Sequence, residues 1–212
     1  MIKAVIFDLD GVLVFTDKFH YKAWKKIADE MGIYFDEKIN NRLRGVSRMA
    51  SLEIILERYT GEQLSEERKL ELANMKNDYY RELLSMMTYD DVDQSVRDTI
   101  AELKKRGYRL AIGSSSKNTK YILERVGLIK EFDAISDGTN ITHSKPDPEV
   151  FLKAAEFIYI DPKECLVVED AEAGIDAAIA GGMHSAAIGD AVNCQKAEFD
   201  LDDLTDLLKI CN

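Results

Sequence analysis

The chain has 212 residues, of which 46% are hydrophobic and 32% charged, as in ordinary soluble globular proteins. This length predicts one domain with an insertion, or two small domains. With 28 Lys and Arg against 39 Asp and Glu, the formal net charge is −11. Because this charge repels nucleic-acid phosphates and anionic lipid surfaces, we expect neither nucleic acid nor a membrane as a partner. An acidic small substrate would need a local positive charge, such as a metal ion.

The cysteine pattern predicts a reducing compartment. Cys165, Cys194 and Cys211 are odd in number and lack metal-ligand or C-x-x-C spacing, so neither a disulfide framework nor a zinc site is indicated. No apolar run reaches the roughly 18 residues of a membrane span, and the apolar run before Asp8 is too short for a signal peptide. We therefore expect a cytoplasmic protein, and we expect it to be a monomer.

The first predicted element is a strand at residues 2–7, an apolar run rich in β-branched residues that stops at Asp8. Helix and strand patterns alternate again after about residue 90. The expected strands cover residues 108–112, 132–136, 165–168 and 184–188, and the expected helices cover residues 95–106, 118–126, 147–158 and 173–180, with a closing amphipathic helix at 200–212. This alternation predicts an α/β fold with a doubly wound parallel sheet and helices on both faces.

Between the first strand and the rest of the sheet lies a helical segment. Residues 18–88 show no strand pattern, and their apolar residues recur every three or four positions. Gly32 and Gly61 are predicted helix ends, and Ser65 is a predicted helix start. We therefore divide the chain into a core catalytic domain at residues 1–15 and 88–212, and an inserted helical cap domain at residues 16–87.

Polar side chains that could act in catalysis or ligand binding follow the predicted strands. They are Asp8 with Asp10, Ser114 with Ser116, Lys145, and Glu169 with Asp170. Ligands of such sheets bind beyond the carboxyl ends of the strands, where these groups would meet. Four ionised carboxylates cannot share a small site without a cation, and oxygen ligands favour Mg²⁺ or Ca²⁺. Mg²⁺ also leaves positions open for water and a phosphate oxygen.

Each of these groups also has a purely structural interpretation. An aspartate at the end of a strand is often a turn residue or a helix cap, and Ser114 to Ser116 could simply be N-caps of the next helix. Lys145 could be a solvated surface lysine, and Glu169 with Asp170 could cap the helix that follows them. The Asp8-Leu9-Asp10-Gly11 sequence after an apolar strand favours the functional interpretation of its two aspartates, whereas Ser114–Ser116 and Lys145, each taken alone, favour the structural one.

The motifs resemble those of a known superfamily. Asp8-Leu9-Asp10-Gly11-Val12, Ser114, Lys145-Pro146 and Glu169-Asp170, in this order and at these intervals, resemble the four motifs of the haloacid dehalogenase superfamily. The resemblance covers the whole chain and implies a Rossmann-like core with a helical cap. Further matches are similar to the sugar-phosphate mutases of that superfamily: Thr16, His20, residues 43–48, Lys76-Asn77 and residues 114–118.

The resemblance implies a role for each matched residue. Asp8 would be the nucleophile that forms an aspartyl-phosphate, and Asp10 the general acid and base. Ser114 and Lys145 would hold the transferring phosphoryl oxygens. The implied Mg²⁺ ligands are Asp8, Asp10 through its backbone carbonyl, and Asp170, with Glu169 close by. The implied substrate-binding residues are Asp10, His20, Gly45, Val46, Arg48, Lys76, Ser116, Lys117 and Asn118.

Within this substrate-binding set, Arg48 would bind the phosphate that is not transferred, because its planar guanidinium suits two phosphate oxygens. His20 and Lys76 would help to align Asp10 and seal the cap to the core. Both His20 and Arg48 also have structural interpretations, as a partly buried histidine and as a surface arginine.

The activity that this resemblance implies is the interconversion of β-glucose 1-phosphate and glucose 6-phosphate through a 1,6-bisphosphate. The substrate would be a small phosphosugar. The first alternative is a Mg²⁺-dependent sugar-phosphate phosphatase, in which water receives the phosphoryl group. The second is a non-catalytic phosphosugar-binding module, against which the presence of both Asp8 and Asp10 argues.

Overall fold

The structure is a computed structural model that describes residues 1–43 and 46–212. Gly45, one of the predicted substrate-binding residues, lies outside the described residues. Contacts divide the chain into two compact units. The core unit comprises Met1–Phe15 and Met87–Asn212, and the helical unit comprises Thr16–Met86. Their functional division into a catalytic core and a cap stays a prediction.

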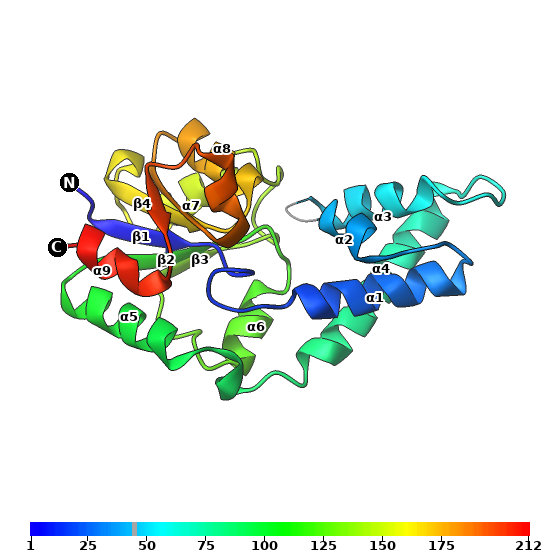
Figure 1. Cartoon of the computed structure of the whole chain (residues 1–212), viewed down its shortest axis with the longest axis horizontal. Coiled ribbons are helices and arrows are strands. Elements are labelled where there is room, and N and C mark those ends of the chain that lie inside the picture. Colours follow the sequence, from blue (N-terminus) through cyan, green and yellow to red (C-terminus); the bar gives the residue numbers. More distant parts are fainter. Residues whose placement is uncertain (44–45) are drawn as a thin grey trace. The chain divides into compact units, whose positions relative to one another are not determined.

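The core unit contains a parallel sheet (Figure 1). In the described part of the chain its strands are β1 (Ala4–Phe7), β2 (Arg109–Gly113), β3 (Ala134–Ser136), β4 (Cys165–Glu169), β5 (His184–Ile188) and β6 (Phe199–Leu201). Their order across the sheet is β3-β2-β1-β4-β5-β6, and every neighbouring pair is parallel. The chain therefore reverses its direction of winding at β1, which confirms the predicted doubly wound fold.

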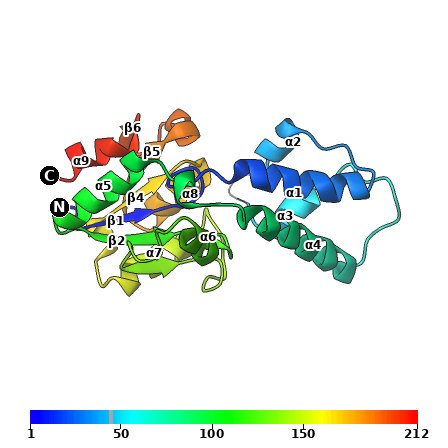
Figure 2. The ribbon, with the colours of Figure 1, turned by 90° about the horizontal axis from the view of Figure 1, so that it is seen from below.

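Helices cover both faces of this sheet, with α7 and α8 on one side and α5 and α9 on the other (Figures 1 and 2). The helices of the core unit are α5 (Gln94–Lys105), α6 (Thr119–Arg125), α7 (Glu149–Phe157), α8 (Glu172–Ala180) and α9 (Leu207–Ile210). Short 3₁₀ helices occur at Tyr89–Asp91, Pro162–Glu164, Gly189–Cys194 and Leu204–Asp206. In the described residues, no helix combines the length and apolar character needed to cross a bilayer.

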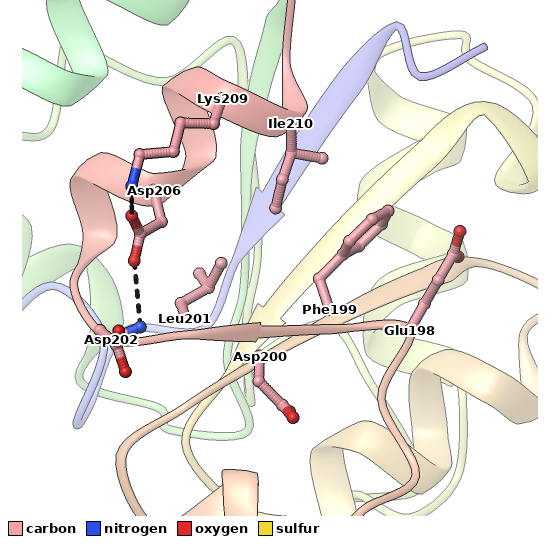
Figure 3. A pocket seen from close by; sticks show the side chains of 8 residues that line it. All are labelled: Glu198, Phe199, Asp200, Leu201, Asp202, Asp206, Lys209 and Ile210. Atoms are coloured by element: carbon pink, nitrogen blue, oxygen red, sulfur yellow. Dashed lines mark hydrogen bonds and ion pairs between the residues drawn. The ribbon is translucent and has the colours of Figure 1, made fainter.

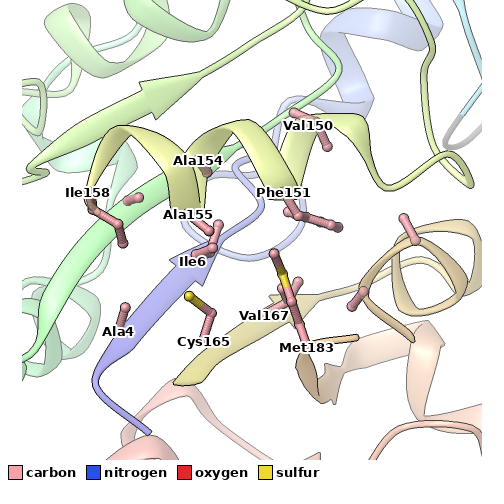
Figure 4. Close-up of a cluster of buried hydrophobic side chains, with 13 residues drawn as sticks. Ala4, Ile6, Val150, Phe151, Ala154, Ala155, Ile158, Cys165, Val167 and Met183 are labelled. Carbon is pink, nitrogen blue, oxygen red and sulfur yellow. The ribbon is translucent and has the colours of Figure 1, made fainter. Parts of the chain in front are cut away.

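A buried apolar layer joins α7 and α8 to the sheet (Figure 4). Ile6 and Val167, from the adjacent strands β1 and β4, pack in one cluster with Phe151 and Ala154 of α7. All four residues of β1 are fully buried, as expected for a strand with helices on both faces. The register places Phe7 opposite Ile112 and Val168, so β1, β2 and β4 end within one residue of one another.

The helical unit has its own apolar core. Its helices are α1 (Asp17–Glu30), α2 (Glu37–Asn41), α3 (Arg48–Leu56) and α4 (Glu66–Leu84). Residues such as Trp24, Ile27 and Leu52 form a buried cluster with Leu72. The predicted start of α4 is confirmed, because the Ser65 side chain accepts from the backbone N–H of Arg68.

Of the two glycines predicted to end helices in this unit, one does so and one does not. Gly32 follows α1 with a φ of 68°, a left-handed conformation that favours glycine. The prediction for Gly61 is wrong, because α3 ends at Leu56, and residues 57–61 lead away from it without helical structure.

The C-terminal segment also differs from the prediction. Instead of one amphipathic helix over residues 200–212, the chain forms strand β6, a 3₁₀ turn and the short helix α9. Leu201 is buried and Asp200 is exposed, an alternation typical of a strand, and the segment pairs with β5. The spacing of Leu204 and Leu207 resembles a helical face, but the 3₁₀ turn at Leu204 interrupts it.

Candidate active site

Three predicted site residues lie where adjacent strands of the core unit end. Asp8 follows β1, Ser114 follows β2 and Glu169 is the last residue of β4. The backbone N–H of Asp8 donates to the carbonyl of Val168 at 3.0 Å, which holds the first residue after β1 against β4. Since β1 is where the winding reverses, these residues lie at the edge of the sheet where ligands of such folds bind.

Lys145 connects two of these carboxylates. Its Nζ contacts Asp8 Oδ1 and lies 2.5 Å from Glu169 Oε1. All three side chains are buried, with exposed fractions of 5% for Lys145, 9% for Asp8 and 2% for Glu169. The interpretation of Lys145 as a solvated surface lysine is therefore wrong.

Glu169 also contacts the start of the helix that follows it, which is part of what its structural interpretation predicts. Its Oε2 accepts from the backbone N–H of Ala171 at 2.9 Å, at the start of α8. One carboxylate therefore serves both the helix terminus and Lys145. The functional and structural interpretations of this residue do not exclude each other.

Ser114 belongs to a tightly bonded loop between β2 and α6. Its backbone N–H donates to Ser136 of β3 at 3.1 Å, and its Oγ accepts from the backbone N–H of Ser116 at 3.3 Å. Ser116 Oγ in turn accepts from the backbone N–H of Asn118 at 3.2 Å. Ser114 and Asn118 are buried, Ser116 is partly exposed and Lys117 is exposed.

These serines are not N-caps of the following helix. α6 begins at Thr119, so Asn118 is the residue that precedes its first turn. Ser114 and Ser116 stabilise the turn instead, each accepting from the backbone N–H two residues further on. The loop therefore holds its backbone in place beside Asp8's strand and leaves the Ser114 hydroxyl hydrogen available as a donor.

Burial and mutual repulsion raise the pKa values of two acidic groups in the core unit. Burial, with the charges of Glu169 and Asp10, raises the pKa of Asp8 to about 7, although Lys145 opposes the shift. Burial, followed by the charges of Asp8, Glu169 and Asp10, raises the pKa of Asp170 to about 8. Burial lowers the pKa of Lys145, but Asp8 and Glu169 outweigh this effect and raise it above its ordinary value. The single ammonium does not neutralise this set of carboxylates.

The donor set suits a hard divalent cation. Asp170 lies against the loop after Asp8, because a Cβ on Gly11 would come within 2.0 Å of Asp170 Oδ2. Gly11 has a φ of 86° and closes a turn with Val14, so both its conformation and its lack of a side chain are needed here. A cation among these oxygens would remove the repulsion that raises the two pKa values, and oxygen ligands favour Mg²⁺. The residues therefore fit such an ion.

Another acidic group has a weaker case as a metal site. In residues 1–43 and 46–212, His143, Asp147 and Glu149 form a group whose candidate ligand atoms all lie within 4.8 Å of one another. Glu149 Oε2 already accepts from the backbone N–H groups of Thr142 and His143, and its Oε1 pairs with Lys153 at 2.8 Å. These contacts stabilise the loop before α7 without a metal.

Predicted residues of the helical unit form a second cluster. Lys76 is buried, and its Nζ lies 2.8 Å from His20 Nδ1 and 4.6 Å from the centre of the Tyr80 ring. Arg48, the first residue of α3, donates from Nη2 to Asn77 Oδ1 at 2.8 Å. The structure thus brings His20 to Lys76 and gives Arg48 a fixed partner. Val46 is exposed.

Some residues that shape these clusters were not among the predicted site residues. Asn77 was quoted only as part of the resemblance, yet it is the partner of Arg48. Gly138 donates its backbone N–H to Ser116, and a Cβ there would lie 2.4 Å from the carbonyl oxygen of Ser115. Gly174 makes room for Glu169 in the same way. No sequence periodicity marks such close approaches.

A groove in the core unit contains none of the predicted site residues (Figure 3). It has a volume of about 460 Å³ and lies along β6 and α9. Four of its eight lining residues are acidic, and its one basic residue, Lys209, pairs with Asp206 at 2.5 Å. This charge does not favour a phosphorylated ligand.

Residues 2–182 match the model of the haloacid dehalogenase-like hydrolase family. The chain belongs to this family of enzymes, which confirms the superfamily resemblance; the family generally uses Mg²⁺. Within it, the chain is 41% identical over 193 residues to a β-phosphoglucomutase of Bacillus subtilis, covering 88% of this chain and 83% of that protein. A solved β-phosphoglucomutase structure from Clostridium difficile has a TM-score of 0.90 and 38% identity, covering 98% and 93% of the two chains.

Phosphatases of the family are also similar to this chain. A phosphorylated carbohydrates phosphatase of Thermotoga maritima is 30% identical over 183 residues, covering 85% of this chain and 82% of that protein. The shared core therefore does not by itself separate a mutase from a phosphatase.

Proposed function

We propose that this protein is a β-phosphoglucomutase that interconverts β-D-glucose 1-phosphate and β-D-glucose 6-phosphate through an aspartyl-phosphate and β-glucose 1,6-bisphosphate. The observation that carries the phosphoryl transfer in this proposal is the buried contact of Lys145 with Asp8 and Glu169 at the point where the sheet winding reverses. The 41% identity to the Bacillus subtilis enzyme supports the mutase over the phosphatase. We also propose that it acts as a cytoplasmic monomer.

Asp8 is the nucleophile in this proposal. One of its carboxylate oxygens bonds to phosphorus while the bond between phosphorus and the donor oxygen breaks, leaving the phosphoryl group on Asp8. Lys145 keeps the carboxylate in its attacking position through their direct contact. The Lys145 ammonium and the Ser114 hydroxyl then donate hydrogen bonds to the phosphoryl oxygens, where negative charge is concentrated.

Asp10 moves the proton. As a carboxylate it accepts the proton of the sugar 6-hydroxyl when that oxygen attacks the aspartyl-phosphate, and as an acid it returns a proton to the leaving oxygen. Asp10 is partly exposed, which leaves its side chain accessible to a substrate. The isolated bridge between Asp10 and Val14 fixes the backbone of this residue in the loop.

The proposed Mg²⁺ ligands are the carboxylates of Asp8 and Asp170 and the backbone carbonyl of Asp10, with Glu169 nearby. Bound there, Mg²⁺ would neutralise charge on the transferring phosphoryl group. Glu169 contributes mainly through Lys145, because one of its oxygens is held by that ammonium and the other by Ala171.

The remaining predicted residues bind the rest of the substrate in this proposal. Arg48 binds the phosphate that is not transferred, and its contact with Asn77 fixes the guanidinium. His20 and Lys76 help to orient Asp10 and the substrate. Ser116, Lys117, Asn118, Val46 and Gly45 complete the proposed binding set.

A product assay separates the mutase from the phosphatase. The protein is incubated with β-glucose 1-phosphate, Mg²⁺ and a catalytic amount of β-glucose 1,6-bisphosphate, while glucose 6-phosphate and inorganic phosphate are measured together. A mutase accumulates glucose 6-phosphate with little free phosphate. Stoichiometric inorganic phosphate without glucose 6-phosphate would establish the phosphatase instead. A panel of other hexose 1-phosphates then defines the sugar.

A further inference from the structure

Gly174 occupies a position where glycine is unfavourable. It lies in the first turn of α8, between Ala173 and Ile175, with an ordinary right-handed helical conformation. Glycine in a helix costs about 0.5–1 kcal/mol relative to alanine, because its backbone loses more freedom on folding. Conformational need therefore does not explain this residue.

The space beside Gly174 does explain it. A Cβ at this position would lie 2.0 Å from both Cδ and Oε1 of Glu169, and 2.4 Å from Glu169 Cγ. These separations are far below van der Waals contact, so an added methyl group requires movement of Glu169 or of the helix. Glu169 is buried and its two oxygens are held by Lys145 and Ala171, so its side chain has no free end that could turn away.

We propose that Gly174 is a positioning residue for Asp8. It acts through Glu169 and Lys145, whose contacts hold the Asp8 carboxylate in the orientation needed for nucleophilic attack. The carboxylate of Glu169 reaches Lys145 only because α8 presents no side chain at position 174. Lys145 in turn contacts Asp8. The assignment of Asp8 as nucleophile rests on the proposed function, whereas the packing of Glu169 against Gly174 does not.

Displacing Glu169 changes the contacts of a buried ammonium. Lys145 has Glu169 and Asp8 as carboxylate partners, and a buried charge that loses one partner is left partly uncompensated, which favours a rearrangement around it. A methyl group on residue 174 therefore changes the direction and tightness of the contact between Lys145 and Asp8. Nucleophilic attack is sensitive to such changes, since a displacement of the reacting group by about 1 Å reduces the rate by about 100-fold.

The first experiment measures the phosphorylation of Asp8 by acetyl phosphate in Gly174→Ala, under conditions where circular dichroism shows the variant to be folded. We expect the rate to fall by about 100-fold. The matched control is Gly181→Ala at the other end of α8, where a Cβ meets nothing closer than 3.4 Å. This control should retain the wild-type rate. An unchanged rate in folded Gly174→Ala would overturn the proposal.

A double-mutant cycle identifies Glu169 as the residue through which Gly174 acts, and it uses urea unfolding as its readout. Gly174→Ala should lower stability in the wild-type background and in Glu169→Gln, which keeps the bulk of the side chain. In Glu169→Ala the same substitution should raise stability, because the clash is gone and alanine favours the helix. Destabilisation of equal size in all three backgrounds would refute the role of Glu169, even if Gly174→Ala itself folds poorly.

A crystal structure of Gly174→Ala separates this inference from the proposed function. We expect the separation of Lys145 Nζ and Glu169 Oε1 to exceed hydrogen-bond distance and the contact of Lys145 with Asp8 to change. Unchanged contacts would overturn the inference. If the wild-type protein lacks mutase activity while these contacts still change, the proposed function fails and the packing inference stands.

Discussion

Lys76 Nζ lies 2.8 Å from His20 Nδ1 in the helical unit. An ammonium group only donates hydrogen bonds, so Nδ1 must accept and the proton of the neutral imidazole must be on Nε2. Burial, together with the positive charges of Lys76 and Arg48, lowers the pKa of His20 well below 6.5. His20 is thereby held as a neutral side chain with Nε2–H as its donor.

The first prediction concerns the titration of His20. Nitrogen-detected NMR should show the Nε2–H tautomer at pH 7 and no titration of this ring near pH 6.5. Because unfolding restores the ordinary pKa of 6.5, the unfolded state binds more protons below that pH, so stability should decrease as pH falls through 6.5. His20→Gln should remove that part of the decrease in urea unfolding. A ring that titrates at or above pH 6.5 would contradict the assignment.

The second prediction concerns the partner of Arg48. Asn77→Ala removes the amide oxygen that accepts from Arg48 Nη2. We expect KM for β-glucose 1-phosphate to rise by about tenfold, equivalent to about 1.4 kcal/mol, because the guanidinium is no longer fixed. Phosphorylation by acetyl phosphate, which has no second phosphate, should be unaffected. Asn41→Ala, at an exposed position at the end of α2, is the control. Equal losses in the two assays would contradict this role.

The structure brings predicted residues together where the sheet aligns positions that are distant in sequence. Asp8, Ser114 and Glu169 each follow an apolar run, and parallel strands that end in register bring such residues to one edge. Their convergence is a consequence of strand order. The alternation of helices and strands predicts the parallel sheet, and the residue at which each apolar run stops predicts which side chains lie at that edge.

Contacts that depend on side-chain packing could not be predicted in this way. Arg48 and Asn77 are 29 residues apart on different helices, and no pattern in either helix specifies their contact. In the sequence, Gly174 is one small residue among the alanines of its helix. Nothing there indicates that a neighbouring side chain occupies the space beside it. At the C-terminus, β6 has only three residues, too few for alternation to outweigh the helical spacing of Leu204 and Leu207.

The third prediction concerns proton transfer by Asp10. Asp10→Asn keeps the size of the side chain but removes its ability to accept and return a proton. We expect mutase turnover to fall by about 100- to 10,000-fold, with the melting temperature nearly unchanged. Steady-state assays with β-glucose 1-phosphate and thermal unfolding provide the two measurements. Turnover close to that of the wild type would exclude Asp10 as the general acid and base.

The fourth prediction locates the Mg²⁺ site. Mg²⁺ at about 100 times its dissociation constant should stabilise the wild-type protein by about 2.7 kcal/mol, because the ion binds the folded state. Asp170→Asn should abolish most of this gain in thermal unfolding. Asp147→Asn, which alters the surface group near Glu149, should leave the gain intact. The reverse outcome would place the metal in the loop before α7.

The fifth prediction concerns backbone strain at Tyr159. This residue follows α7 with a φ of 59°, and it is 92% exposed. Its N–H donates to Glu156, and the N–H of Ile160 donates to Ala155, the pattern of a helix end that favours glycine at position 159. A left-handed conformation costs a residue with a side chain about 1–2 kcal/mol, and the exposed ring regains little of this through packing.

Tyr159→Gly should therefore raise the free energy of unfolding by about 1 kcal/mol. Tyr159→Ala is the matched control, since it removes the ring but keeps the Cβ that disfavours this conformation, and its stability should stay close to that of the wild type. Urea unfolding of the two variants distinguishes strain from loss of the aromatic ring. If both variants gain equally, the exposed ring rather than the backbone conformation is the source of the cost.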